Sequence, residues 1–225
     1  MITTELELKK FEHKINWLKL IYYQVERTLG NIFFKKKPKI LMENVNLLNL
    51  GCGPLIYEGW CNADDFAFKR SLREKGFRPE WRLDLTKEWN CNSDLWDGVF
   101  SQHVLEHLTY SEAIHVLREC LRTMKTGAHI RISVPSLDKY INFYNGNIVS
   151  PEYVDNFPNR AVAISFISQM HSHKSLWNSE LLRQVMTEVG FIDVKERTYL
   201  KGGDPRILKD QDVKDWESLY VEGRK

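Results

Sequence analysis

Two glycines separated by one residue could bring a ligand against bare backbone. Gly51 and Gly53 follow a short apolar run that ends at Leu50, with Cys52 between them. Glycine lets the chain turn sharply and places no side chain in the way of a ligand. A dinucleotide site would add a third glycine at position 56, where Ile56 stands. The spacing therefore predicts either a tight turn or a ligand site, and it argues against nicotinamide chemistry.

Aspartates after two further short runs could complete such a site. Asp64 and its neighbour Asp65 follow one run, and Asp84 follows the next. A carboxylate at a strand end can accept hydrogen bonds from both hydroxyls of a ribose. Asp84, after the next short run, could accept a hydrogen bond from the exocyclic amine of adenine. Aspartates also cap helices and stabilise turns, so each one alone leaves both roles open.

A polar run, Ser101-Gln102-His103, follows another apolar segment, and Glu106 lies three residues after His103. That spacing predicts a polar pair between His103 and Glu106. Histidine can act as a general base, although a single histidine is more often a hydrogen-bonded structural group. Glu106 and His107 lack the H-E-x-x-H spacing of zinc sites, so no metal site is expected.

Strands separated by helices must hold these residues. Short apolar runs predict strands at residues 45–50, 61–64, 97–101, 128–134, 192–199 and 218–222. Helical spacing of apolar residues predicts helices over 105–121 and 179–189. This alternation is typical of an α/β fold with a doubly wound, mostly parallel sheet. Ligands of such sheets bind beyond the carboxyl ends of the strands, where the candidate residues lie.

Residues 1–39 form a separate basic arm. They hold nine Lys/Arg and four Asp/Glu, against 23 and 26 in the remainder. A capping box at Thr4 and an apolar seam from Leu8 to Leu29 predict an amphipathic helix, followed by a lysine-rich linker. The helix could pack on its own domain, mediate self-association or lie on a membrane surface.

Composition sets the remaining limits. The chain has 225 residues, 43% apolar and 28% charged, which can build a packed core. No basic stripe with interleaved aromatics runs through the body, so there is no strong nucleic-acid signal. The four cysteines form no C-x-x-C pair, and no apolar run approaches the roughly 18 residues of a membrane span. We expect a cytoplasmic protein.

Taken together and in order, the motifs resemble class I S-adenosylmethionine (SAM)-dependent methyltransferases, and most closely the small methyltransferase-like (type 11-like) family. Leu48–Gly53 is similar to the glycine-rich opening, and Gly59–Asp64 to a GW-N-D second strand. Trp96–Leu108 resembles the fD-v-hvLEHl segment, and Leu117–Gly127 the L-E-RvLKPGG helix and turn. The likeness covers residues 45–225. Further similar stretches are Ile130–Ser136, His173–Phe191 and Ser218–Glu222.

This resemblance implies a Rossmann-like sheet of seven strands, one of them antiparallel, after an N-terminal helix. It implies SAM as the cofactor and a small-molecule or sugar-like methyl acceptor. The glycines would approach the methionine and ribose, Asp64 would bind the ribose hydroxyls, and Asp84 the adenine amine. The cofactor-binding residues that it implies are Gly51, Cys52, Gly53, Asp64, Asp84, Leu85, Ser101 and Gln102.

The resemblance also indicates where an acceptor would bind. A base is needed only where the acceptor must lose a proton. His103, after the fourth strand, is the first candidate, and His173, with His171, is the second. Residues 136–178 are a long, aromatic-rich connection, which predicts a lid-like insertion in a domain spanning 40–225.

Four positions depart from the family pattern, and two of them, Thr126 and Ala128, replace the Pro and Gly of the surface turn in L-E-RvLKPGG. Asn49 stands where an acid often precedes the first glycine, and Leu55 replaces the usual third glycine. The departures at Asn49 and Leu55 favour an alternative in which the chain is a non-catalytic binding or interaction module that kept the fold.

Overall fold

The computed structural model of the chain describes residues 45–65 and 79–225, together with Leu18, Ile21, Val25, Lys37, Pro38 and Ile40. The predicted helix and linker of residues 1–39 lie outside this description, apart from isolated positions. The described ranges contain every residue predicted to bind the cofactor or to act as a base. Among described residues, no helix is long and apolar enough to cross a membrane.

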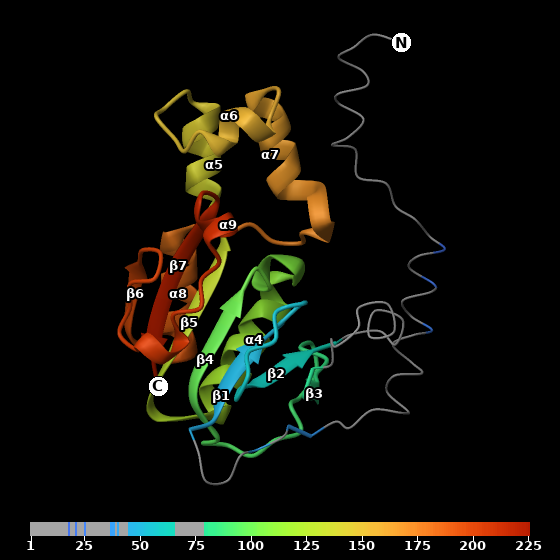
Figure 1. Ribbon diagram of the computed structural model, residues 1–225, viewed down its shortest axis with the longest axis vertical. Coiled ribbons are helices and arrows are strands. Elements are labelled where there is room, and N and C mark those ends of the chain that lie inside the picture. Colours follow the sequence, from blue (N-terminus) through green and yellow to red (C-terminus); the bar gives the residue numbers. More distant parts are fainter. Residues whose placement is uncertain are drawn as a thin grey trace.

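Seven strands form one sheet in the order β3-β2-β1-β4-β5-β7-β6 (Figure 1). Neighbours from β3 to β5 pair in parallel, whereas β7 runs antiparallel to both β5 and β6. The predicted α/β class, with one reversed strand in a mostly parallel sheet, is confirmed. The strands are β1 (Leu47–Leu50), β2 (Cys61–Asp64), β3 (Trp81–Arg82), β4 (Trp96–Gln102), β5 (Met124–Pro135), β6 (Ile192–Arg197) and β7 (Ser218–Arg224).

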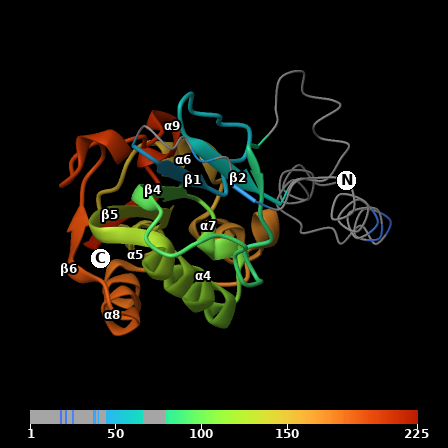
Figure 2. The same ribbon diagram turned by 90° about the horizontal axis from the view of Figure 1, so that it is seen from below.

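One face of the central strands is apolar and packs on two helices. Leu48 and Leu50 share this face because alternate strand residues point the same way. They join Val99 of β4 in a single buried core. Helices α4 (Tyr110–Thr123) and α8 (Ser179–Val189) contribute buried side chains to that core and lie side by side along the sheet (Figure 2).

The opposite face carries a buried charged network. Arg131 of β5 is fully buried and forms ion pairs with Asp210 at 2.5 Å and Glu222 at 2.8 Å. Its guanidinium also donates to the carbonyls of Thr198 and Lys201. A buried charge is tolerated only when it is paired. This network therefore fastens residues 198–217, which we call the β6–β7 segment, to the sheet. That segment contains η3 (Pro205–Ile207) and α9 (Asp212–Asp215).

Helix α4 begins later than its apolar pattern indicates. The prediction of one helix from Leu105 is wrong, because Leu105–His107 form a separate 3₁₀ turn, η1, and α4 starts at Tyr110. The Thr109 hydroxyl accepts from the Glu112 amide, and the Glu112 carboxylate accepts from the Thr109 amide. This capping box fixes the start of α4.

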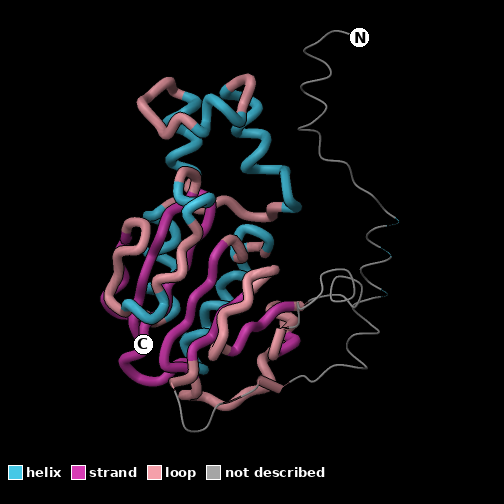
Figure 3. The backbone as a smooth tube through the Cα atoms, viewed as in Figure 1, coloured by secondary structure: helices cyan, strands magenta, loops and turns pink. Residues whose placement is uncertain are grey.

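The connection between β5 and α8 is a helical layer beyond the carboxyl ends of β4 and β5 (Figures 1 and 3). Its aromatic residues pack on one another in a second core that includes Tyr140, Phe143, Tyr153 and Phe157. The layer therefore has a hydrophobic interior of its own. Its elements are α5 (Leu137–Tyr144), α6 (Glu152–Asn156), α7 (Arg160–Gln169) and η2 (Met170–Ser172).

Candidate functional site

The carboxyl ends of β1 and β2 bring the glycine turn and Asp64 together. The amides of Gly51 and Cys52 both donate to the Ala63 carbonyl, at 2.8 and 3.1 Å. The Gly53 amide donates to Asp64 Oδ2 at 2.9 Å. The turn after β1 and the carboxylate that ends β2 therefore form one continuous edge.

The adjacent carboxylate has a different partner. Asp65 Oδ1 accepts from Arg82 Nη2 of β3 at 3.3 Å. Of the two neighbouring aspartates, Asp64 thus faces the glycine turn and Asp65 is tied to β3. The sequence could not decide which of the two aspartates would face the ligand site, and these contacts favour Asp64.

The two glycines have different surroundings, although both have φ in the left-handed region, at 66° and 53°. A Cβ on Gly51 would overlap a methyl group of Val104, whereas one on Gly53 would meet nothing within 4 Å. Gly51 is therefore required for close packing against Val104. Gly53 presents bare backbone to open space beside Asp64, where a ligand could lie.

A small hollow of about 60 Å³ opens between the ends of β1 and β4. Gln102 and His103 line it together with Gly51, and the β6–β7 segment contributes Gln211 and Lys214. Small-molecule pockets usually enclose about 300 Å³ or more. The hollow alone could hold only part of a ligand, and the remainder would lie over the open glycine turn.

A larger cavity, of about 600 Å³, lies at the amino edge of the sheet. Residues 88–92 line it with Lys37, Ile40 and Arg122. The Arg122 guanidinium is already paired with Glu119 and donates to two backbone carbonyls. Ligands of doubly wound sheets bind at the carboxyl ends, so we place the candidate site at the smaller hollow.

Several predicted cofactor residues have structural partners instead. Ser101 is buried, and its hydroxyl donates to the Leu50 carbonyl at 3.2 Å. Asp84 Oδ1 accepts from the amide and the hydroxyl of Thr86, as in a turn. Leu85 packs against the main core. None of these predicted residues lines the hollow, and their contact with a cofactor stays a prediction.

Gln102 and Cys52 do line the hollow. Gln102 Oε1 accepts from the Gln211 amide at 3.3 Å, while its Nε2 is buried with no hydrogen-bond partner among the described residues. A carbonyl or hydroxyl of a ligand could satisfy that donor. Burial, and then the charge of Asp64, raises the pKa of the Cys52 thiol, so Cys52 is neutral and unreactive.

His103 lies directly after β4 with a φ of 54°, which is strained for a residue other than glycine. Its Nε2 is 2.7 Å from the Ser218 hydroxyl, which itself donates to the Lys214 carbonyl. Ser218 therefore accepts from Nε2–H, and Nδ1 carries the lone pair. Burial, and then the charge of Lys214, lowers the pKa of His103 to about 3, so the ring is neutral near pH 7.

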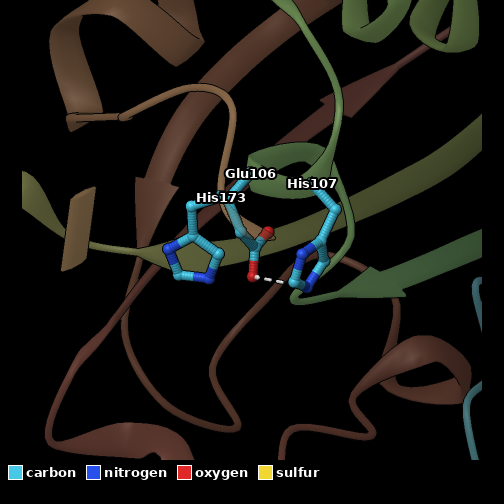
Figure 4. A group of neighbouring side chains, drawn as sticks. All are labelled: Glu106, His107 and His173. Carbon is cyan, nitrogen blue, oxygen red and sulfur yellow. Dashed lines mark ion pairs between the residues drawn. The ribbon is translucent and has the colours of Figure 1, made fainter. Parts of the chain in front are cut away.

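Glu106 is the partner predicted for His103, with Oε1 3.4 Å from His103 Nδ1, which confirms the pair. The Glu106 side chain is 2% exposed, and neither carboxylate oxygen has a hydrogen-bond partner among the described residues. Burial raises the pKa of Glu106 to about 8. The carboxyl group lies between the rings of His107 and His173 (Figure 4).

His173 belongs to this second cluster rather than to the hollow. Its ring centroid is 5.1 Å from that of His107. Burial lowers the pKa of His173 and lowers the pKa of His107 to about 4. Sequence reasoning selected His173 but gave no role to His107. The sequence did show Glu106 and His107 side by side, but it could not show that His173 joins them from a distant segment.

No family model and no curated protein matches this sequence. Solved structures with a similar fold do exist. A SAM-dependent methyltransferase from Archaeoglobus fulgidus is 19% identical, with a TM-score of 0.52 over 100% of both chains. A SAM-dependent methyltransferase from Thermotoga maritima is 14% identical, with a TM-score of 0.50 over 92% of each chain. At these identities the likeness concerns the fold, and the type 11-like family stays a prediction.

Proposed function

From the class I SAM-dependent methyltransferase fold of this chain, we propose that the protein binds SAM and transfers its methyl group to a small molecule. The cofactor would lie along the carboxyl ends of β1, β2 and β4. The sulfonium supplies an already activated methyl group. The chain's own task is to bind the adenosine and hold the acceptor in line, and such positioning can supply about 7–11 kcal/mol of the barrier.

The observation that carries this proposal is the contact between Gly53 and Asp64. Their 2.9 Å hydrogen bond holds a carboxylate beside a stretch of backbone where a ligand would meet no side chain. A carboxylate forms strong, charge-assisted hydrogen bonds with hydroxyl donors. The arrangement fits a ribose at Asp64 and the rest of the ligand over the turn.

We keep His103 as the candidate base, although both of its ring nitrogens already contact other side chains. The ring lines the hollow, but Nε2 is bound to Ser218 and Nδ1 faces Glu106. To accept a proton from the acceptor, the ring must give up one of these contacts. This arrangement favours acceptors that attack as neutral amines, because they need no base during the transfer.

We further propose that the helical layer of residues 136–178 covers the acceptor. It lies beyond the carboxyl ends of β4 and β5 (Figure 1), and the Lys174 amide ties its end to the Glu106 carbonyl at 2.7 Å. Its large aromatic side chains pack within the layer. An acceptor would therefore meet the ends of the layer, near His103 and His173, rather than its aromatic core.

Calorimetric titration with SAM and with S-adenosylhomocysteine tests the proposed cofactor. Asp64→Asn should weaken binding about tenfold or more, since hydrogen bonds to a charged group contribute about 1.5–3 kcal/mol each. Asp65→Asn is the matched control, because that carboxylate faces Arg82, and it should bind like the wild type. Failure of the wild type to bind SAM at millimolar concentration would contradict the proposal.

The alternative, a binding module without catalysis, has specific support. Val104 packs directly against Gly51, on the turn that would otherwise approach the cofactor. The Asn49 amide is already engaged with the Leu55 carbonyl at 2.8 Å and with Asn62 Oδ1 at 2.9 Å. Release of S-adenosylhomocysteine, measured over a panel of amine and hydroxyl acceptors, decides between the two. SAM binding without release across the panel favours the module.

A further inference from the structure

One cluster beside the candidate site has the composition of a metal centre. Glu106, His107 and His173 each place one potential ligand atom within 4.8 Å of the others. The Glu106 carboxyl group lies between the two imidazole rings, with Oε1 3.9 Å from His107 Nε2 (Figure 4). Two ligand atoms of a tetrahedral zinc ion lie about 3.4 Å apart. Modest side-chain rotations would therefore bring all three groups onto one ion.

The Glu106 carboxyl group has close neighbours but no hydrogen bond among the described residues. Both of its oxygens are buried without a hydrogen bond from any described residue. His103 Nδ1 approaches Oε1 to 3.4 Å, but the two groups do not form a hydrogen bond. Burying such a polar group unsatisfied is costly. A cation bound by these oxygens would supply the missing interaction.

The His173 imidazole is held as metal-binding histidines usually are. His173 Nδ1 donates to the Ile167 carbonyl at 2.7 Å, which leaves Nε2 as its unprotonated nitrogen. His107 directs its Nε2 toward the same carboxyl group, 3.9 Å from Glu106 Oε1. Metal-ligating histidines almost always donate their second ring N–H to a carbonyl, carboxylate or water, which fixes the ring orientation.

Backbone contacts hold the two contributing segments together. The Lys174 and Ser175 amides donate to the Glu106 carbonyl at 2.7 and 3.2 Å. The Ser175 hydroxyl donates to the Leu105 carbonyl at 3.1 Å. The end of the helical layer is thereby fastened to η1, and His173 is fixed beside Glu106.

We propose that Glu106, His107 and His173 bind one divalent first-row transition metal ion, represented by Zn²⁺. Two imidazoles and one carboxylate suit Zn²⁺ better than Mg²⁺, which prefers oxygen ligands. Three protein ligands leave a position for water or another oxygen ligand, on the side where the His107 side chain is 40% exposed. This site replaces the expectation of no metal, which rested on the missing H-E-x-x-H spacing, and it does not depend on SAM binding.

The test measures metal binding directly on the full chain. Chelator-treated protein is titrated with Co²⁺, whose visible absorption reports its coordination, and then with Zn²⁺ in competition. We expect one ion per chain, displaced by Zn²⁺ but not by millimolar Mg²⁺. His173→Asn and Glu106→Gln should each weaken binding about tenfold or more, because even changes behind the ligands typically cost about 10- to 100-fold.

His171→Asn is the matched control. It lies in the same segment, its side chain is outside the cluster, and asparagine tolerates the φ of 56° at that position. It should bind Co²⁺ like the wild type. Thermal melts identify variants that fail to fold, and His173 is only partly buried, so His173→Asn keeps the test decisive if Glu106→Gln unfolds.

Two results would overturn the metal site. One is a wild-type protein that shows no Co²⁺ spectrum at sub-millimolar metal. The other is equal Co²⁺ affinity of His173→Asn and His171→Asn. Calorimetric titration of the chelator-treated protein with SAM shows whether SAM binds without the metal. Failure of the metal site can therefore be distinguished from failure of the proposed SAM binding.

Discussion

Neighbouring residues of one motif have different roles in this protein. Gly51 is required because Val104 occupies the space that a Cβ would take, whereas Gly53 faces open space. Ser101 is turned to the Leu50 carbonyl, whereas the next residue, Gln102, borders the hollow. At the residue scale, a motif thus combines packing positions with positions that can meet a ligand.

We expect Gly51→Ala to destabilise the protein more than Gly53→Ala. Both backbones have positive φ, which costs about 1–2 kcal/mol in other residues. Only at Gly51 does the added methyl overlap Val104, and overpacking adds about 1–3 kcal/mol. Urea denaturation measures the two free energies of unfolding, and equal values would contradict the packing role. Gly53→Ala should instead weaken SAM binding in calorimetry.

Short-range spacing predicted the local parts of the site. The pair of His103 and Glu106 could be predicted because the two residues lie within one turn of chain. The placement of His173 against Glu106 could not, because it depends on how the end of a long insertion returns to η1. Nor could the sequence show that Asp65 accepts from Arg82 while Asp64 accepts from the Gly53 amide, since these contacts depend on the positions of β3 and of the glycine turn.

The ends of helices were predicted best where a glycine with positive φ terminates the helix. Helix α8 closes at Gly190, with a φ of 118°, as its pattern predicts. Helix α4 was predicted to begin too early because Leu105 and Leu108 continue its apolar spacing. The Thr109–Glu112 capping box, which is visible in the sequence, decides its start.

The aromatic residues of the helical layer form the interior of the layer itself. Tyr140, Tyr153 and Phe157 are all at least 95% buried against one another and against Trp216 of the β6–β7 segment. A layer that extends beyond the sheet cannot share the main core. Aromatic rings bury the most area per residue and so supply its stability.

Two tyrosines of this layer give a paired prediction. The Tyr140 hydroxyl donates to Glu217 Oε2 at 2.9 Å, whereas the buried Tyr153 hydroxyl has no hydrogen-bond partner among the described residues. Tyr140→Phe should cost about 1–3 kcal/mol, because it removes a hydrogen bond from a buried carboxylate. Tyr153→Phe should be neutral or stabilising. Thermal unfolding compares the two variants, and a larger loss for Tyr153→Phe would contradict these contacts.

Across the whole molecule, the two edges of the sheet differ in their chemistry. The carboxyl edge holds the hollow and the Glu106 cluster, where the buried Gln102 Nε2 and Glu106 oxygens have no hydrogen-bond partner in the described part of the chain. The amino edge is fastened by paired charges. Lys125 donates to both carboxylate oxygens of Asp97 at 2.8 Å, and the Asn46 amide donates to Asp97 Oδ2 at the same distance.

The contacts of Asp97 at the amino edge predict that the free energy of unfolding depends on pH. Burial raises the pKa of Asp97, but the hydrogen bonds from Lys125 and Asn46 outweigh it and hold the pKa below its usual value. A lowered pKa in the folded state contributes stability above the unfolded pKa of about 3.9, and that contribution is lost as the pH falls through the folded pKa. Wild type should therefore exceed Asp97→Asn in stability at pH 7 and approach it near pH 3. Urea midpoints at both pH values measure this, and a constant gap would contradict it.

The sequence could locate most strands, because apolar runs mark them, but not their order. Nothing in the residues of β6 and β7 indicates that β7 inserts between β5 and β6, and the resemblance implied only that one of seven strands is antiparallel. Arg131 shows a second limit, since a charged residue within an apolar strand gives no sign of its partners. Asp210 and Glu222 come from a segment and a strand far along the chain.

The position of β7 affects how the protein is made. The ribosome synthesises β6 before the strand that joins it to the rest of the sheet. Until residues 218–224 emerge, β5 presents an unpaired edge and β6 has no neighbour. Open edges of this kind invite pairing with other chains. We therefore expect a nascent polypeptide that stalls shortly before Ser218 to aggregate more readily than one that includes β7.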